Sequence, residues 1–125
     1  ELVEDEDFEY AVAEGIKGWY PRLEAVSLIA QQGTLGGSGW MIEQLVEGIQ
    51  TSRFAVYRVD EVCSATTFLA LGISIGLNRP FLMVSKVNRE VPLDLRGIAM
   101  YRFPNFVTLR REFVPKHKTF LVRYS

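Results

Sequence analysis

The fold is decided by residues 52–84, which read SRFAVYRVDEVCSATTFLALGISIGLNRPFLMV. The stretch divides into four parts: an apolar run over 53–59, the acidic pair Asp60 and Glu61, a helix-like segment over 65–78 and a second apolar run over 79–84. Two short apolar runs joined by a helix are typical of a βαβ unit with parallel, buried strands. The two carboxylates then lie at the carboxyl end of the first strand, the edge at which open α/β sheets bind ligands.

The rest of the chain extends this pattern. Apolar residues recur at helical spacing within 8–19 and within 41–51, and residues 106–113 favour a short helix or an extended segment. Further apolar runs predict three strands: residues 23–29, 98–103 and 119–124. Helices that alternate with short strands indicate a parallel sheet covered on both faces. We therefore expect one α/β domain over residues 1–125, a three-layer sandwich with five parallel strands and a flavodoxin-like winding.

Composition excludes several classes of protein. The formal net charge of −1 gives no global basic field that would recruit nucleic acid. No apolar run approaches the roughly 20 residues that span a bilayer. The single cysteine, Cys63, excludes an internal disulfide and fits a reducing compartment, so we expect a cytoplasmic protein. Because the chain begins with Glu1 rather than Met, we expect a processed product, a tag-cleaved product or a piece of a longer protein.

Three segments, taken in order, carry a family resemblance. Residues 39–60 combine an isoleucine-bearing helix, a Ser-Arg pair and a strand closed by Asp; residues 67–84 lead through Leu-Gly to a Pro and a strand. Residues 91–96 contain Pro-Leu-Asp-Leu and are followed by Met-Tyr. Together, over residues 39–109, they resemble nucleoside 2-deoxyribosyltransferase-like proteins. Toll/interleukin-receptor-like NAD-cleaving domains share the same general architecture more remotely.

The resemblance implies a lost catalyst. In the family, the residue before the Leu-Gly pair is Glu, the nucleophile that attacks the sugar carbon, whereas Ala70 stands there in this chain. A methyl group can neither form a glycosyl-enzyme intermediate nor stabilise an oxocarbenium-like transition state. The Asn that usually opens the helix is also replaced, by residues 65–67. A neighbouring acid, Asp60 or Glu61, could substitute only from within about 3 Å of the same carbon.

The resemblance also implies a rearranged sheet. The family opens with a central strand, yet this chain starts at the first helix. Residues 119–124 have the pattern of the missing strand, and residues 1–10 look like what should follow it. We therefore expect residues 119–124 to fill the sheet centre beside residues 23–29, in a circularly permuted domain. The alternative is an excised fragment whose last strand pairs at an edge.

The expected ligand site combines two parts of the chain. Its residues are Gly37, Ser38, Trp40, Asp60, Glu61 and Thr67. The Gly-Gly-Ser-Gly segment over 36–39 precedes a helix, where an anion could bind, but it lacks the Lys and the spacing of a P-loop, so a plain flexible loop competes. Asp60 and Glu61 could bind a sugar hydroxyl; alternatively, Asp60 caps the following helix or turn.

The remaining reactive side chains are isolated. His117 is the only histidine and stands in a basic turn that we expect to be exposed, so neither a metal site nor a triad is expected. Cys63 follows two acids, which disfavour a thiolate. No metal and no cofactor is expected. Charges are uneven along the chain: residues 1–7 are acidic, and the later part is locally basic, which we interpret as a solvated face.

Three functions stay open. The first is a catalytically degenerate domain that binds or senses a nucleotide or nucleoside-like ligand. The second is an enzyme of the deoxyribosyltransferase or NAD glycohydrolase type, which cleaves an N-glycosidic bond with Asp60 or Glu61. The third is a structural or oligomerisation domain without a ligand. Late aromatic residues could line an interface, so we expect a homo-oligomer or packing against another domain: Phe103, Phe106, Phe113 and Phe120.

Overall fold

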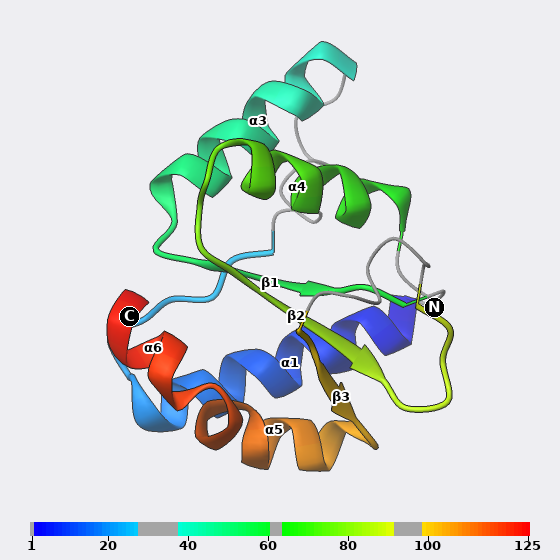
Figure 1. Cartoon of the computed structure of the whole chain (residues 1–125), viewed down its shortest axis with the longest axis vertical. Coiled ribbons are helices and arrows are strands. Elements are labelled where there is room, and N and C mark those ends of the chain that lie inside the picture. The colour runs from blue at the N-terminus through cyan, green and yellow to red at the C-terminus, as the bar shows by residue number, and fades with distance from the viewer. Residues whose placement is uncertain (1, 28–37, 61–63, 92–98) are drawn as a thin grey trace.

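The computed structural model of the protein describes residues 2–27, 38–60, 64–91 and 99–125 and places helices on both faces of a short sheet (Figure 1). The elements follow in the order α1 (Leu2–Trp19), α3 (Ser38–Thr51), β1 (Ala55–Arg58), α4 (Ala65–Gly76), β2 (Phe81–Lys86), β3 (Tyr101–Phe103), α5 (Phe106–Lys116) and α6 (Lys118–Tyr124). The expected α/β class is confirmed. No helix in the described part of the chain is long and apolar enough to cross a membrane.

The sheet is built around the predicted βαβ unit. Strand β2 pairs in parallel with β1, with Ala55 opposite Phe81, and also with β3, with Val84 opposite Tyr101. The order is therefore β1-β2-β3. The residues that the structure describes form three strands, rather than the five that the sequence predicts.

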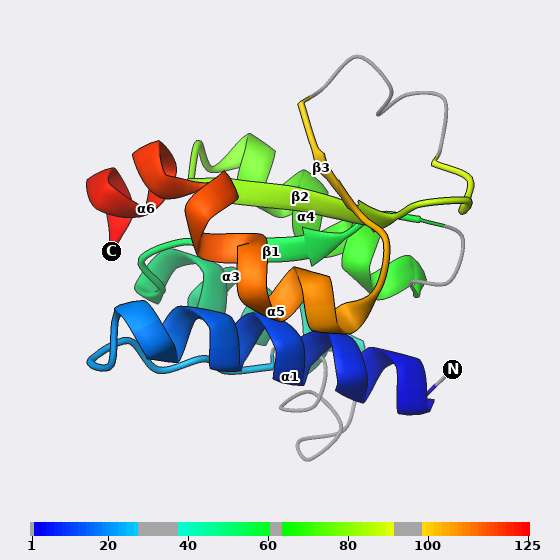
Figure 2. The ribbon, with the colours of Figure 1, turned by 90° about the horizontal axis from the view of Figure 1, so that it is seen from below.

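Each face of the sheet has its own core, because successive side chains of a strand point to opposite faces. Met83 packs with the side chains of α3 and α4, and its neighbour Val84 packs with those of α1, α5 and α6. Helices α1 and α5 lie side by side beneath the sheet (Figure 2). They cross closely at Gly15, where an added Cβ would lie 2.7 Å from the carbonyl oxygen of Arg110. Only glycine fits this crossing without a shift of the backbone.

The strand predicted over residues 119–124 is wrong, because the structure has helix α6 there. The buried and half-buried residues His117, Phe120, Leu121 and Tyr124 recur at helical spacing, and the rings of Phe120 and Tyr124 lie 4.8 Å apart as an i, i+4 pair. Leu121 is fully buried against the α1–α5 side. This segment therefore fills neither the centre nor the edge of the sheet.

The predicted circular permutation is also wrong, because it required residues 119–124 to be a strand of the sheet. The two ends of the chain lie on opposite sides of the molecule, the C-terminus at the left and the N-terminus at the right in both views (Figures 1 and 2). Residues 23–27, where the sequence predicts a neighbouring strand, are an irregular segment, tied to α1 by a hydrogen bond that Ser27 Oγ donates to Glu9 (2.8 Å). Residues 28 and 29 lie outside the described ranges.

Candidate functional site

Asp60 lies at the carboxyl edge of the sheet, two residues after β1, and is fully buried. Its carboxylate oxygens accept from Nε of Arg58, at 3.2 Å for Oδ1 and 3.0 Å for Oδ2. Oδ2 also accepts from the backbone N–H of Lys86, the last residue of β2, at 3.0 Å. The carboxylate thus joins the ends of two neighbouring strands. It does not cap α4, whose N-cap residue is Ser64.

Arg58 completes a buried ion pair with Asp60. Its guanidinium carbon lies 5.7 Å from the ring centroid of Phe103 and 5.8 Å from that of Phe106. Contacts of this kind between a cation and aromatic rings favour the charged form at a desolvated position. The pair therefore links β1 to β3 and to the start of α5, and it fixes the geometry of this edge.

Two cationic side chains, those of Lys86 and Arg102, lie near this edge of the sheet. Nζ of Lys86 lies 5.3 Å from the ring centroid of Phe106. Exposed Arg102 on β3 donates from Nη2 to the carbonyl oxygen of Arg89 (3.0 Å), in the turn that follows β2. The same turn has Asn88 at a φ of 66° and is tied to β3 by the N–H of Val87, which donates to the carbonyl oxygen of Phe103 (2.8 Å). Lys86 and Arg102 are thus held near one end of the β2–β3 pair.

Ala70 occupies the position of the family nucleophile, and its side chain is buried in the core between α3, α4 and the sheet. Its carbonyl oxygen accepts from the hydroxyl of Tyr57 (3.3 Å), which also lies 2.6 Å from Oγ of Ser74. Burial raises the pKa of the Tyr57 hydroxyl, and the hydrogen bond to Ser74 partly opposes this rise. Position 70 therefore faces a neutral core.

The other expected ligand residues have different outcomes. Thr67 is buried in the first turn of α4, with its Oγ1 3.4 Å from Oγ of Ser64. The helix predicted over residues 41–51 is confirmed as α3, but it begins at Ser38, inside the glycine-rich segment that was predicted to precede it. It therefore contains both Ser38 and Trp40. Gly37, Glu61 and Cys63 lie outside the described residues, so their predicted roles stay predictions.

The exposed position predicted for His117 is wrong. The residue is half-buried between Phe113 and Tyr101, with ring centroids at 4.6 Å and 5.5 Å, and its Nδ1 lies 2.8 Å from the carbonyl oxygen of Phe113. Burial lowers the pKa of His117, and the contact with the Phe113 carbonyl partly opposes this shift. Across the ranges 2–27, 38–60, 64–91 and 99–125, no group of three or more His, Cys, Asp or Glu residues could hold a metal ion.

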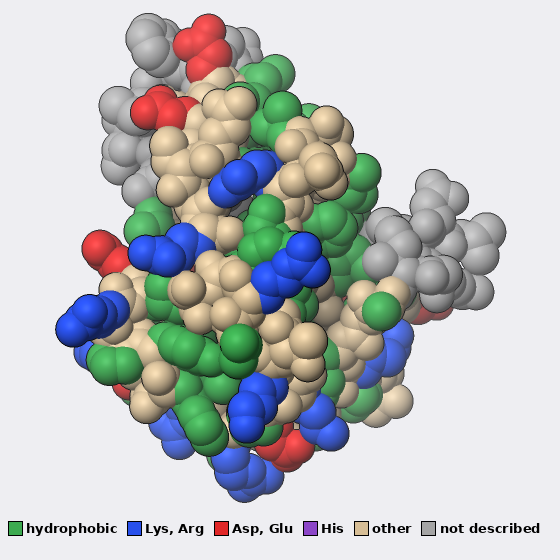
Figure 3. All heavy atoms as spheres, turned by 60° about the vertical axis from the view of Figure 1, so that its left-hand side comes forward, with side chains coloured by type: hydrophobic (Ala, Val, Ile, Leu, Met, Phe, Trp, Pro, Cys, Tyr) green, Lys and Arg blue, Asp and Glu red, His purple; other side chains and the backbone are tan. Residues whose placement is uncertain are grey.

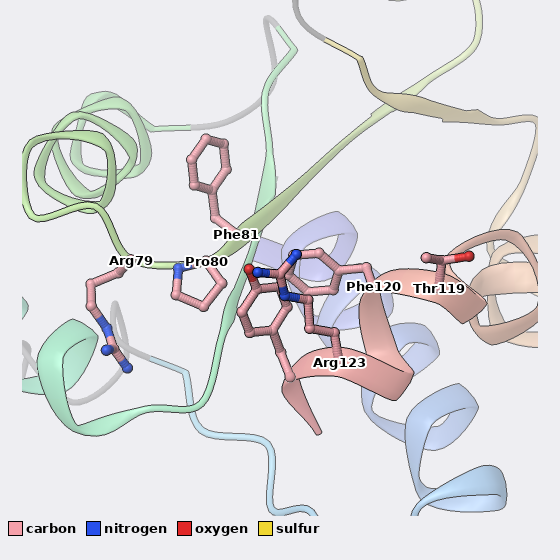
Figure 4. A pocket seen from close by; sticks show the side chains of 7 residues that line it. Arg79, Pro80, Phe81, Thr119, Phe120 and Arg123 are labelled. Carbon is pink, nitrogen blue, oxygen red and sulfur yellow. The ribbon is translucent and has the colours of Figure 1, made fainter.

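A shallow depression of about 530 Å³ lies at the opposite, amino edge of the sheet (Figure 4). Its lining combines the start of β2 with one side of α6: Arg79, Pro80, Phe81, Thr119, Phe120, Arg123 and Tyr124. Nη2 of Arg79 donates to the carbonyl oxygen of Ser52 (2.7 Å). The sequence interpretation missed this feature because it assigned residues 119–124 to a strand. The spacing of Phe120, Arg123 and Tyr124 was the signal that could have revealed it.

Comparisons of the chain with known protein families, with curated proteins and with solved structures give no match. The resemblance to nucleoside 2-deoxyribosyltransferase-like proteins therefore stays a prediction. What the structure itself defines is a parallel α/β domain with a buried Arg58–Asp60 pair at the carboxyl edge of its sheet.

Proposed function

We propose that this domain is a catalytically silent module that binds a nucleotide or nucleoside-like ligand at the carboxyl edge of its sheet. Parallel α/β sheets bind ligands at this edge. Lys86 ends β2 at this edge and Arg102 on β3 reaches the turn that follows β2, and ammonium and guanidinium groups suit phosphate oxygens. The order β1-β2-β3 also supports a flavodoxin-like winding. We also propose a cytoplasmic location, which the single cysteine favours.

The absence of catalysis is supported by one observation, the burial of Ala70 among the side chains of the α3–α4 core. No reacting carbon can lie next to a side chain that is enclosed in this way. The enzymatic alternative would assign the chemistry to Asp60 or to Glu61, and Glu61 lies outside the described residues. For Asp60 the structure is informative. That carboxylate is fully buried and already accepts from Arg58 and from the N–H of Lys86, which favours a structural role.

The assembly alternative is favoured by the outer surface of α4. This helix has no charged residue, and it exposes Leu69 (40%) and Ile75 (51%). An added Cβ at Gly72 or Gly76 would meet nothing within 4 Å. An uncharged, partly apolar surface of this kind suits contact with another domain.

A thermal-shift screen against nucleosides, nucleotides, NAD and cyclic dinucleotides tests the proposal. A ligand that binds only the native state stabilises it by about 2.7 kcal/mol at one hundred times Kd, so Tm should rise by several degrees. The site variant is Lys86→Ala, and the matched control is Lys17→Ala, an exposed lysine in the last turn of α1. Asp60→Ala is unsuitable, because it removes the carboxylate of a buried ion pair and so lowers stability by itself.

The expected result is a shift that Lys86→Ala weakens and Lys17→Ala retains, together with no turnover of the bound ligand. Turnover of the ligand would instead establish the enzyme. A screen without any shift would favour the assembly domain.

A further inference from the structure

The charges of this chain are separated along the sequence. Six carboxylates and no base occur in the first ten residues: Glu1, Glu4, Asp5, Glu6, Asp7 and Glu9. Residues 102–125 hold one acid, Glu112, and six bases: Arg102, Arg110, Arg111, Lys116, Lys118 and Arg123. The whole chain is nevertheless almost neutral, with a formal net charge of −1. The acidic segment begins α1, and the basic segment ends with α6.

The depression at the amino edge is lined in part by α6, the last element of the basic segment. In the view of Figure 4, Pro80 lies between the side chains of Arg79 and Arg123. The guanidinium carbon of Arg123 lies 5.3 Å from the ring centroid of Tyr124. None of the described residues that line the depression is acidic. On the α6 side of the molecule, Lys and Arg side chains surround hydrophobic ones (Figure 3).

The acidic start of the same chain cannot reach this depression. The two chain ends lie on opposite sides of the molecule (Figures 1 and 2). Between them α1 is a continuous helix of 18 residues, which at 1.5 Å per residue is about 27 Å long. Helix α1 is also fixed against α5 by the close crossing at Gly15. A carboxylate-rich helix start that enters the depression must therefore come from another molecule.

We propose that the depression binds the acidic first turns of α1 of a second copy, so that copies of the chain associate head to tail. Carboxylates of one copy meet Arg79 and Arg123 of the next. Asp7 and Tyr10 are exposed at the acidic end, so a ring is also available to the aromatic lining. Because the two surfaces differ, the contact is heterologous and leaves one free surface at each end. The small lining makes each contact weak and sensitive to salt.

Sedimentation equilibrium over a range of protein concentrations tests this contact. The mean mass should rise with concentration at about 0.01 M salt and return to the monomer at about 1 M, where the Debye length falls from about 30 Å to about 3 Å. Arg123→Glu should lower the association constant about tenfold, because it places like charges opposite each other. The matched control, Arg111→Glu, makes the same change of net charge at an exposed guanidinium outside the depression and should leave the association constant unchanged.

A mixing experiment identifies the occupant. The double variant Glu6→Lys, Asp7→Lys reverses two charges of the acidic segment. At a protein concentration at which the wild type is only partly associated, this variant and Arg123→Glu should each be monomeric alone. Mixed in equal amounts, the two variants should associate through two contacts. A new lysine of the double variant meets the new carboxylate in the depression of Arg123→Glu, and the native acidic segment of Arg123→Glu meets the native depression of the double variant. Far-ultraviolet circular dichroism checks that each variant is folded.

Four results would overturn the proposal: a wild-type monomer at every concentration, association that persists at high salt, equal losses in Arg111→Glu and Arg123→Glu, or folded variants that stay monomeric when mixed. A wild-type protein that stays monomeric but cosediments with phosphatidylserine-containing vesicles would also overturn the proposal. The occupant of the depression would then be a lipid surface.

Discussion

The two faces of β1 hold different kinds of buried polar pair. Tyr57 faces α4, where its hydroxyl meets the hydroxyl of Ser74, and the next residue, Arg58, faces the opposite side and pairs with Asp60. A buried charge is costly when its partner is removed, whereas an unpaired hydroxyl costs only the loss of a neutral hydrogen bond. The α5 side should therefore be most sensitive to the removal of one member of its pair, and the α4 side should tolerate small changes provided that they remain neutral.

The largest expected effect is the loss of Asp60. Asp60→Ala leaves the buried Arg58 guanidinium without its carboxylate, which should lower the free energy of unfolding by about 3–5 kcal/mol. Urea denaturation followed by circular dichroism measures the change. The double variant Arg58→Met, Asp60→Leu should be less destabilised than the single one, since no charge remains buried. A single variant that loses less than about 1 kcal/mol would show that the edge is not fixed by this pair.

The second prediction introduces a charge on the neutral side. Ala70→Glu inserts a carboxyl group and additional volume into the α3–α4 core, so it should destabilise the fold by about 2–4 kcal/mol. The matched control is Ala65→Glu, an exposed position at the start of the same helix, where an acid is favoured by the helix dipole. Urea denaturation of both variants provides the comparison. A stable Ala70→Glu variant that gains glycosidase activity would mean that position 70 reaches a ligand site.

Glycine substitutions compare the helix packing on the α1–α5 side of the sheet with the open outer surface of α4. Gly15→Ala forces the crossing of α1 and α5 apart, because the added Cβ meets the backbone oxygen of Arg110, and should cost about 1–3 kcal/mol. Gly72→Ala on α4 meets nothing within 4 Å and should instead stabilise the helix by up to about 1 kcal/mol. Thermal melts of the two variants should therefore shift in opposite directions. Equal shifts would contradict the close crossing.

A milder change tests the neutral pair itself. Tyr57→Phe removes one hydroxyl and leaves Oγ of Ser74 without that partner, at an expected cost of about 1–2 kcal/mol. Adding Ser74→Ala to Tyr57→Phe should restore part of the lost stability, because no buried hydroxyl then lacks its partner. Urea denaturation of the two variants measures the difference. A further loss in the double variant would show that Ser74 has another role.

The sequence predicted the centre of this fold better than its ends. The βαβ unit was predictable because two apolar runs flank an uncharged helical segment, and the position of Asp60 after β1 followed from it. Its partner Arg58 was not singled out, because a strand residue between apolar neighbours gives no sign that its guanidinium lies over Phe103 and Phe106. Residues 119–124 were assigned to a strand because a short apolar run fits both periods, and only packing selects the helix.

The smallest expected effect is the contribution of His117 to the pH dependence of stability. This residue packs beside residues 119–124, the segment that was predicted to be a strand. It lies between α5 and α6, and burial holds its pKa below the ordinary value of 6.5. The unfolded chain therefore takes up the proton first as the pH falls. The free energy of unfolding should decrease between pH 6.5 and the lower pKa of the folded state, and this contribution should be constant below both values. Urea denaturation from pH 8 to pH 5 measures this slope. In His117→Gln, which cannot titrate, the change of the free energy of unfolding with pH should be smaller. An unchanged slope would assign the pH dependence to other groups, and the contact between His117 and Phe113 would then not contribute to it.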